Sequence, residues 1–196
     1  RASDSLSYVY RLDEKYWLMM LDSCMCEPVH ETGGKLSEET VAWMKTQLEE
    51  AKKQGVTVIP VSHHNLLDES TLYPEECTIE NTKEVTALLE AYGVPVYLSG
   101  HLHLQRIKKH TSNLNTPGGY GIREIVTSPL PMAPCQYSIL NWQADGSLSY
   151  HTKKVDIAGW AQRYGEEDEN LLNFDAYADQ FLVDVISEQA FKALQS

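Results

Sequence analysis

The residues best suited to chemistry in this sequence are the histidines of the segment Ser99-Gly100-His101-Leu102-His103, which an apolar run at 94–98 leads into. In an extended chain, residues i and i+2 point to the same side, so His101 and His103 would present two imidazoles to one point. Gly100 removes the side chain that would crowd them. Because neutral imidazole is a common metal ligand, the spacing predicts a metal site.

A second histidine pair follows another apolar run about forty residues earlier, where residues 56–61 lead into Ser62-His63-His64-Asn65. His63 directly follows the run and is the better candidate for a metal ligand. We interpret His64 as lining the pocket or supporting a ligand, or simply as exposed, and we place His64 and Asn65 among the substrate-binding candidates. Two apolar strands that each end in histidine, with a helix between them, are typical of a metal site at the edge of an α/β sheet.

The predicted metal ligands are therefore His63, His101 and His103. Three imidazoles could hold one zinc ion with an open position, or they could be one share of a two-metal site whose carboxylates lie elsewhere. Three other histidines lie outside this pattern, and we interpret them as surface or core residues: His30, His110 and His151. The basic cluster Arg106, Lys108 and Lys109 favours a charged edge strand over a substrate-binding patch.

Helices and strands alternate through the first part of the chain. The expected elements are a strand at 7–12, a turn at 13–15, a strand at 16–22, a helix at 37–54, a strand at 56–61, a helix at 82–92 and a strand at 94–99. The run at 16–22 is continuously apolar and is expected to be a central strand covered on both faces. This order favours parallel strands joined by crossover helices.

After His103 the pattern changes to short strands followed by helices. Strand-like runs stand at 104–110, 122–128, 136–142 and 147–155, separated by turn residues at 113–115, 117–119 and 129–134 and by Asp145-Gly146. We expect these strands to be antiparallel, and Asp145-Gly146 to close a hairpin. From residue 157 onward the pattern is helical, with an apolar stripe at Phe181, Leu182, Val185, Ile186 and Ala190.

Charge and composition exclude several classes of partner. The formal net charge is -12, which disfavours nucleic acid and anionic membrane surfaces, because both are bound through Lys and Arg. A small phosphate ester remains compatible, because bound metal ions would reverse the local potential. No apolar run approaches the roughly 18 residues that span a bilayer, and no secretory signal opens the chain. The four cysteines are spaced as reduced thiols rather than as a zinc site.

Four segments together resemble the calcineurin-like metallophosphoesterase family. In chain order they are Leu21-Asp22-Ser23, the segment from Gly34-Lys35-Leu36 to Trp43-Met44, His63-His64, and Gly100-His101-Leu102-His103. The resemblance spans roughly residues 7–155. The family's Asp-x-His, Gly-Asp-x-x-Asp and Gly-Asn-His motifs do not occur in this sequence. The chain therefore looks like the C-terminal half of such an enzyme.

The resemblance implies an α/β fold: half of a four-layer α/β/β/α sandwich with a mixed sheet and antiparallel closing strands, plus C-terminal helices. Residues 1–156 would form the half-domain and 157–196 a helical extension. By the family pattern, His63 and His101 would bind one divalent ion and His103 another, with Mn, Fe or Zn as candidates. The catalytic residues and bridging carboxylates would lie in the missing half. That half, or a self-associated copy, is the expected partner.

The expected function is metal-dependent hydrolysis of phosphate mono- or diesters, with this chain alone nearly inactive. The first alternative is a non-catalytic module that binds a metal ion or a partner. The second is a mononuclear zinc hydrolase that uses Asp22 or Glu27 as its base. The compartment stays open, with the cytoplasm slightly favoured over export.

Overall fold

The chain divides into two compact units, Arg1–Thr127 and Ser128–Ser196. The computed structural model describes residues 1–2, 5–26, 29–68, 75–110 and 121–195. Both histidine pairs that the sequence singles out, His63-His64 and His101/His103, lie in the first unit.

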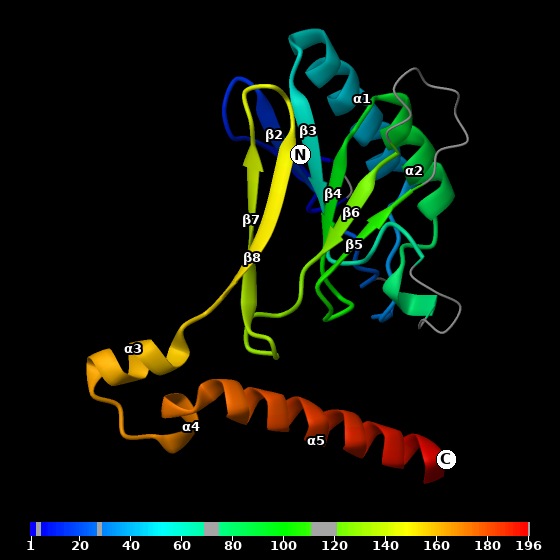
Figure 1. Ribbon diagram of the computed structural model, residues 1–196. Coiled ribbons are helices and arrows are strands. Elements are labelled where there is room, and N and C mark those ends of the chain that lie inside the picture. Colours follow the sequence, from blue (N-terminus) through cyan, green and yellow to red (C-terminus); the bar gives the residue numbers. More distant parts are fainter. Residues whose placement is uncertain (3–4, 27–28, 69–74, 111–120, 196) are drawn as a thin grey trace. The chain divides into compact units, whose positions relative to one another are not determined.

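A six-stranded mixed sheet forms the centre of the first unit (Figure 1). Its spatial order is β1 (Tyr8–Arg11), β2 (Tyr16–Met20), β3 (Thr57–Val61), β4 (Val96–Ser99), β6 (Arg123–Val126) and β5 (Arg106–Lys109). The four inner strands run parallel, and the two edge strands are antiparallel to their neighbours. Because the carboxyl ends of parallel strands meet at one edge, the segments that follow β3 and β4 come together. The predicted mixed α/β fold is confirmed.

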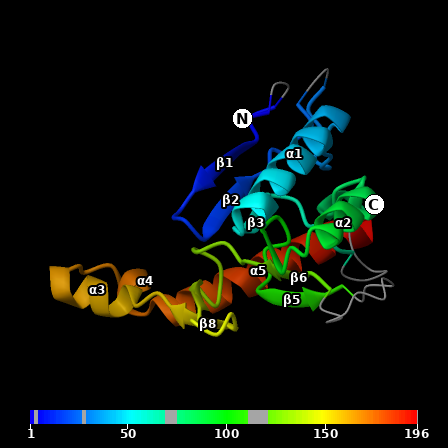
Figure 2. The same ribbon diagram turned by 90° about the horizontal axis from the view of Figure 1, so that it is seen from above.

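Two helices, α1 (Glu38–Gln54) and α2 (Thr82–Ala91), cover one face of this sheet (Figure 2). The predicted start of α1 is confirmed, because the hydroxyl of Ser37 accepts a hydrogen bond from the Thr40 N–H. Gly55 ends α1 with φ 70°, a conformation that glycine adopts at little cost. The helices bury their apolar stripes in one core against the sheet, with Met44 and Leu48 from α1 and Val85 and Leu89 from α2. A 3-10 turn, η1 (Glu75–Cys77), precedes α2.

The two faces of the apolar strand β2 are buried to different extents, and its predicted cover on both faces stays a prediction. Trp17 and Met19 point into the helix-side core and are 2% and 0% exposed. The alternating residues Tyr16, Leu18 and Met20 are only half-buried. Side chains on both faces of β2 are therefore at least partly removed from water.

The strands after His103 pair antiparallel with one another as predicted, β5 with β6 and the run at 136–142 with the run at 147–155, but one of them also joins the parallel set. Strand β6 lies beside β4 and runs parallel to it, and only β5 pairs antiparallel with β6 in this sheet. The expected turn residues at 113–115 and 117–119 fall outside the described residues. The insertion of β6 places a fifth strand next to the one that carries the Gly-His-Leu-His segment.

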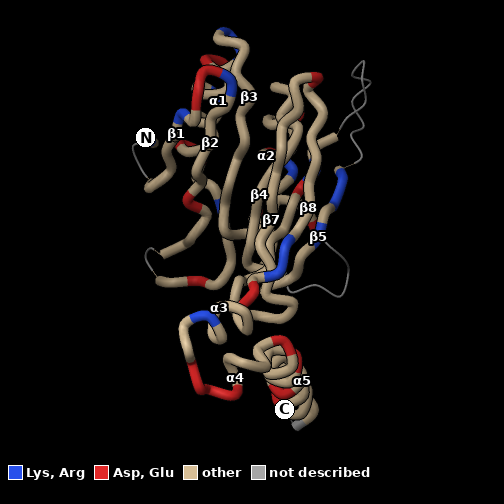
Figure 3. Tube along the Cα trace, turned by 60° about the vertical axis from the view of Figure 1, so that its left-hand side comes forward, with Lys and Arg blue, Asp and Glu red and all other residues tan. Residues whose placement is uncertain are grey.

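The second unit joins a hairpin to three helices. The hairpin strands are β7 (Gln136–Trp142) and β8 (Leu148–Lys154), closed as predicted at Asp145-Gly146. The helices are α3 (Ile157–Tyr164), α4 (Glu169–Leu172) and α5 (Phe174–Gln195). The predicted apolar stripe of α5 is largely exposed, with Phe181 47% and Ile186 57% accessible. Acidic residues outnumber basic ones along α4 and α5 (Figure 3). Among the described helices, none is long and apolar enough to cross a membrane.

Candidate functional site

The turns that follow β3 and β4 bring two of the predicted ligands into direct contact. The Nε2 atom of His63 lies 2.8 Å from Nδ1 of His101, and the two rings are perpendicular with centroids 4.8 Å apart. The backbones are joined as well, since the Gly100 N–H donates to the His63 carbonyl at 3.0 Å. One ring nitrogen donates and the other accepts, so His63 and His101 share one proton between them.

The surroundings of His63 and His101 favour their neutral forms. The pKa of His63 is lowered, first by partial removal from water and then by the neighbouring His64 and His103. The pKa of His101 is lowered by partial burial and then by His64, His63 and His103. Glu76 acts in the opposite direction and raises it. Neutral imidazole is the form that binds a metal ion, so both rings are prepared for coordination near neutral pH.

The turn after β4 is strained and is not the extended chain that the i, i+2 spacing predicted. His101 and His103 both have positive φ, 56° and 57°, in the left-handed region. Between them, the Leu102 N–H donates to the Gly100 carbonyl at 2.6 Å. A left-handed non-glycine residue costs about 1–2 kcal/mol, and such residues cluster at functional sites. The chain reverses sharply after Ser99, and this reversal, rather than strand alternation, sets the direction of both imidazoles.

His64 is a buried and fully hydrogen-bonded ring, only 3% exposed. Its Nε2 lies 3.0 Å from the Thr32 carbonyl oxygen, which only accepts, so Nε2 carries the proton. Its Nδ1 lies 2.8 Å from the Ser23 hydroxyl and accepts from it. The ring centroid is 4.7 Å from that of His101. His64 therefore packs against His101 from the buried side, and both of its ring nitrogens are hydrogen-bonded within the protein.

Gly34 packs directly on the His64 ring. A Cβ atom at this position would lie 2.3 Å from Cγ of His64, which is closer than two carbons can approach. The ring also contacts the Ser23 hydroxyl, so the Leu-Asp-Ser, Gly-Lys-Leu and His-His segments of the sequence converge on one side chain. Segments that are far apart in the sequence thus pack together around the His64 ring.

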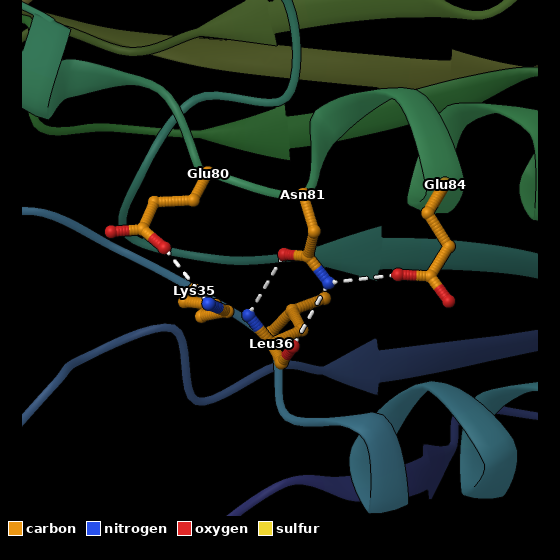
Figure 4. Close-up of polar contacts among 5 residues, drawn as sticks. All are labelled: Lys35, Leu36, Glu80, Asn81 and Glu84. Atoms are coloured by element: carbon orange, nitrogen blue, oxygen red, sulfur yellow. Dashed lines mark hydrogen bonds and ion pairs between the residues drawn. The ribbon is translucent and has the colours of Figure 1, made fainter.

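The segment that carries Gly34 is locked to the start of α2 (Figure 4). The Asn81 side chain accepts from the Leu36 N–H at 3.1 Å and donates to the Leu36 carbonyl at 2.9 Å, as a neighbouring strand would. The Lys35 ammonium lies 3.0 Å from the Glu80 carboxylate, and both side chains are about half exposed. The Glu80 N–H donates to the Gly34 carbonyl at 2.8 Å. These contacts fix the glycine against His64.

Asn65 faces the interior of the unit. It is 0% exposed, and its amide nitrogen donates to the Ser99 hydroxyl at 2.9 Å and to the Gly100 carbonyl at 3.2 Å. Its Oδ1 atom is buried without a hydrogen bond among the described residues. Asn65 thus ties the first histidine turn to the second, and its predicted contact with substrate stays a prediction.

The residues present fit part of a metal site. His63 and His101 supply two converging nitrogen donors from neutral rings, at a position that solvent reaches. Within the described part of the chain, no group of three or more His, Cys, Asp or Glu side chains is arranged to hold a metal ion. His103 is exposed and influences the pKa of both His63 and His101. The assignment of His63, His101 and His103 as metal ligands therefore stays a prediction.

Carboxylates near the site differ from those that the sequence indicated. The Asp22 carboxylate accepts the N–H groups of Leu6 and Cys24, at 3.2 and 3.3 Å, and Glu27 lies outside the described residues. Glu76, which was not expected, accepts a hydrogen bond from the Thr32 hydroxyl and acts on the pKa of His101. No sequence signal marks Glu76, because it reaches the site only through the loop before α2.

Comparisons with known proteins cover parts of the chain. Residues 156–196 match the family model described as the C-terminal domain of cyclic nucleotide phosphodiesterase. Among solved structures, the chain is similar to a dimetal phosphatase from Danio rerio, with 15% identity and a TM-score of 0.47. That match covers 62% of this chain and 48% of the other, so this chain spans about half the length of that structure. No curated protein matches the sequence significantly.

Proposed function

We propose that this chain contributes the histidine side of a divalent-metal site that hydrolyses phosphate esters. The observation that carries the proposal is the 2.8 Å contact between His63 and His101, supported from behind by His64. Two neutral imidazoles meet at the carboxyl edge of a parallel sheet, and one of them is on strained backbone. Strain of this kind is typical of functional sites, and paired imidazoles are typical of metal ligands.

The C-terminal helices support the same class of reaction. Residues 156–196 match a domain named for cyclic nucleotide phosphodiesterase, and a domain of that description accompanies phosphodiester hydrolysis. This match lies in the second unit, whereas the histidines lie in the first, so the two observations are independent. A phosphodiester is thus the first substrate class to test, with monoesters second.

Each residue of the site has a distinct proposed role. His63 and His101 would hold one divalent ion, and His103, which is exposed on the same turn, would approach a second. When bound, such ions polarise the phosphoryl oxygens and neutralise the charge that develops on them. His64 keeps the His101 ring in place, and the Ser23 hydroxyl and the Thr32 carbonyl keep His64 in one tautomer. The remaining ligands would come from the family's other half or from a second copy.

The test is hydrolysis by the complete gene product with Mn²⁺, using an activated aryl phosphodiester, an aryl phosphomonoester and a cyclic nucleotide. We expect turnover that chelation abolishes and that His101→Ala reduces at least a hundredfold. The matched control is His151→Ala, in the exposed face of β8, which should leave turnover unchanged. Undiminished turnover in both His63→Ala and His101→Ala would refute the proposal.

A non-catalytic module is the alternative, and the direct hydrogen bond between His63 and His101 favours it in one respect. The two ring nitrogens that face each other, Nε2 of His63 and Nδ1 of His101, need no metal ion to be hydrogen-bonded. A module of this kind would bind a metal ion or a partner without turnover. Metal uptake that depends on His63 in a gene product with no hydrolysis of any ester in the panel would favour this alternative.

A further inference from the structure

A fully buried carboxylate lies beneath the two histidine turns. Glu124, in β6, is 0% exposed. Its Oε1 accepts from the Leu66 N–H at 2.7 Å and from the Ser99 hydroxyl at 2.6 Å, and its Oε2 accepts from the Leu67 N–H at 2.7 Å. All three distances are in the short range of hydrogen bonds to a charged acceptor. The carboxylate is therefore bound on both oxygens.

These three donors belong to the two segments that carry the histidines. Leu66 and Leu67 directly follow the first turn, Ser62–Asn65, and Ser99 directly precedes Gly100 in the second. The Ser99 hydroxyl also accepts from the Asn65 amide, so a chain of hydrogen bonds runs from Asn65 through Ser99 to Glu124. One carboxylate thus contacts both turns, although Glu124 is about sixty residues from the first of them.

An acidic residue is an unexpected choice at this position. The two residues that follow it in β6 are apolar and buried, with Ile125 and Val126 3% and 0% exposed. Burying a carboxylate costs free energy, whereas burying a valine in the same place would be favourable. The hydrogen bonds offset this cost, but folding alone does not require a charge here. The carboxylate therefore serves a purpose other than core packing. Its two oxygen acceptors hold two loops at a fixed separation.

We propose that Glu124 is a positioning residue that sets the distance between the two histidine turns, and so the 2.8 Å approach of His63 to His101. It acts through Ser99 on one turn and through Leu66 and Leu67 on the other. Its consequence for metal binding rests on the proposed function, whereas its effect on the geometry of the histidine pair does not.

The test is Glu124→Gln, which keeps the shape but places an NH₂ group against a donor. Without metal, the ring ¹⁵N resonances of His63 and His101 report their shared proton directly. We expect both to shift in Glu124→Gln, and the affinity for Mn²⁺ or Zn²⁺ to fall at least tenfold. The control is Leu48→Ala in the core of α1, which lowers stability without touching this hydrogen-bond chain. It should leave the resonances and the affinity unchanged.

Ser99→Ala provides a second variant if Glu124→Gln does not fold. It removes the bonds of Ser99 to Glu124 and to Asn65 but leaves the Leu66 and Leu67 bonds to Glu124 in place, so the His101 resonances should shift while those of His64 stay. Unchanged His63 and His101 resonances in Ser99→Ala or Glu124→Gln, or an equal shift in Leu48→Ala, would overturn the proposal. Shifted resonances in a protein whose wild type binds no metal ion would support the positioning role and refute the proposed function instead.

Discussion

The two histidine turns have opposite physical characters. The turn after β3 is built into the interior: His64 and Asn65 are 3% and 0% exposed, and their side chains are hydrogen-bonded to three other segments. In that turn only the His63 side chain is exposed. The turn after β4 is partly accessible, with His101 intermediate and His103 exposed, and both of these residues have positive φ. One turn is held rigidly by its contacts, and the other is held in a strained shape against it.

This difference explains how a small site can be both rigid and accessible. Strained backbone persists only where its surroundings over-determine it, and the His64 ring, Asn65 and Glu124 supply those surroundings for the second turn. The rings that meet solvent, His63 and His101, can then face a ligand without rearranging. We therefore expect changes at His64 and Asn65 and at the residues packed on them to lower stability, and changes at the accessible rings His63, His101 and His103 to alter binding.

The largest expected effect is that of Gly34→Ala. The added methyl group would overlap the His64 ring, so the ring must move, at a cost of about 3 kcal/mol in the free energy of unfolding, the upper range for overpacking. Chemical unfolding measures this loss. The adjacent Gly33→Ala is the control, because its Cβ would meet only the Met25 methyl group, at 3.4 Å. Equal losses in the two variants would contradict the packing of Gly34 on His64.

Asn81→Ala should have the next largest effect. It leaves the N–H and the carbonyl of Leu36 without their partner, which costs about 1–3 kcal/mol in the free energy of unfolding. Lys35→Ala is the comparison, because it breaks a solvent-screened ion pair and should cost much less. A larger loss in Lys35→Ala than in Asn81→Ala would mean that the ion pair, and not the Asn81 hydrogen bonds, holds the segments drawn in Figure 4 together.

His103→Gly should stabilise the protein while weakening any ligand bound there. Glycine relieves about 1–2 kcal/mol of left-handed strain and costs about 0.5–1 kcal/mol in chain entropy, so the free energy of unfolding should rise slightly. Leu102→Gly, between the two strained residues, relieves no positive φ and should instead lose stability. A destabilised His103→Gly would show that the open turn is not strained.

The smallest expected effect is a dependence of stability on pH. Because the pKa of His63 and of His101 is lower in the folded protein than the ordinary 6.5, the unfolded chain binds more protons below that pH. Stability should therefore decrease as pH falls from about 6.5 through the lowered values, and more steeply in the wild type than in His63→Gln. Solvent around His63 keeps the difference small. Urea unfolding at several pH values measures it, and identical slopes in the two proteins would contradict it.

Sequence alone predicted the elements that depend on local signals. The Ser37 cap, the Gly55 stop and the turn at Asp145-Gly146 each follow from the conformational preference of one or two residues, and all three are found. The pairing of β6 with β4 could not be predicted in this way, because it joins segments whose connection lies largely at 111–120.

The site was predictable in its residues but not in its geometry. The histidine spacing identified His63, His64 and His101, and these do come together. The spacing suggested an extended Gly-His-Leu-His segment, but tertiary contacts impose a strained turn there. An acid next to Ile125 and Val126 in the predicted strand was the available signal for Glu124, and its meaning depends on three donors from distant segments.

The most direct test of the account is calorimetric titration of the wild type and of His63→Ala with Mn²⁺ and with Zn²⁺ at neutral pH. The account predicts that the wild type binds at least one of these ions and that His63→Ala loses at least tenfold in affinity, while His151→Ala binds as the wild type does. Equal affinity in the wild type and His63→Ala, or no binding by the wild type, would contradict the claim that the two histidine turns form a metal site.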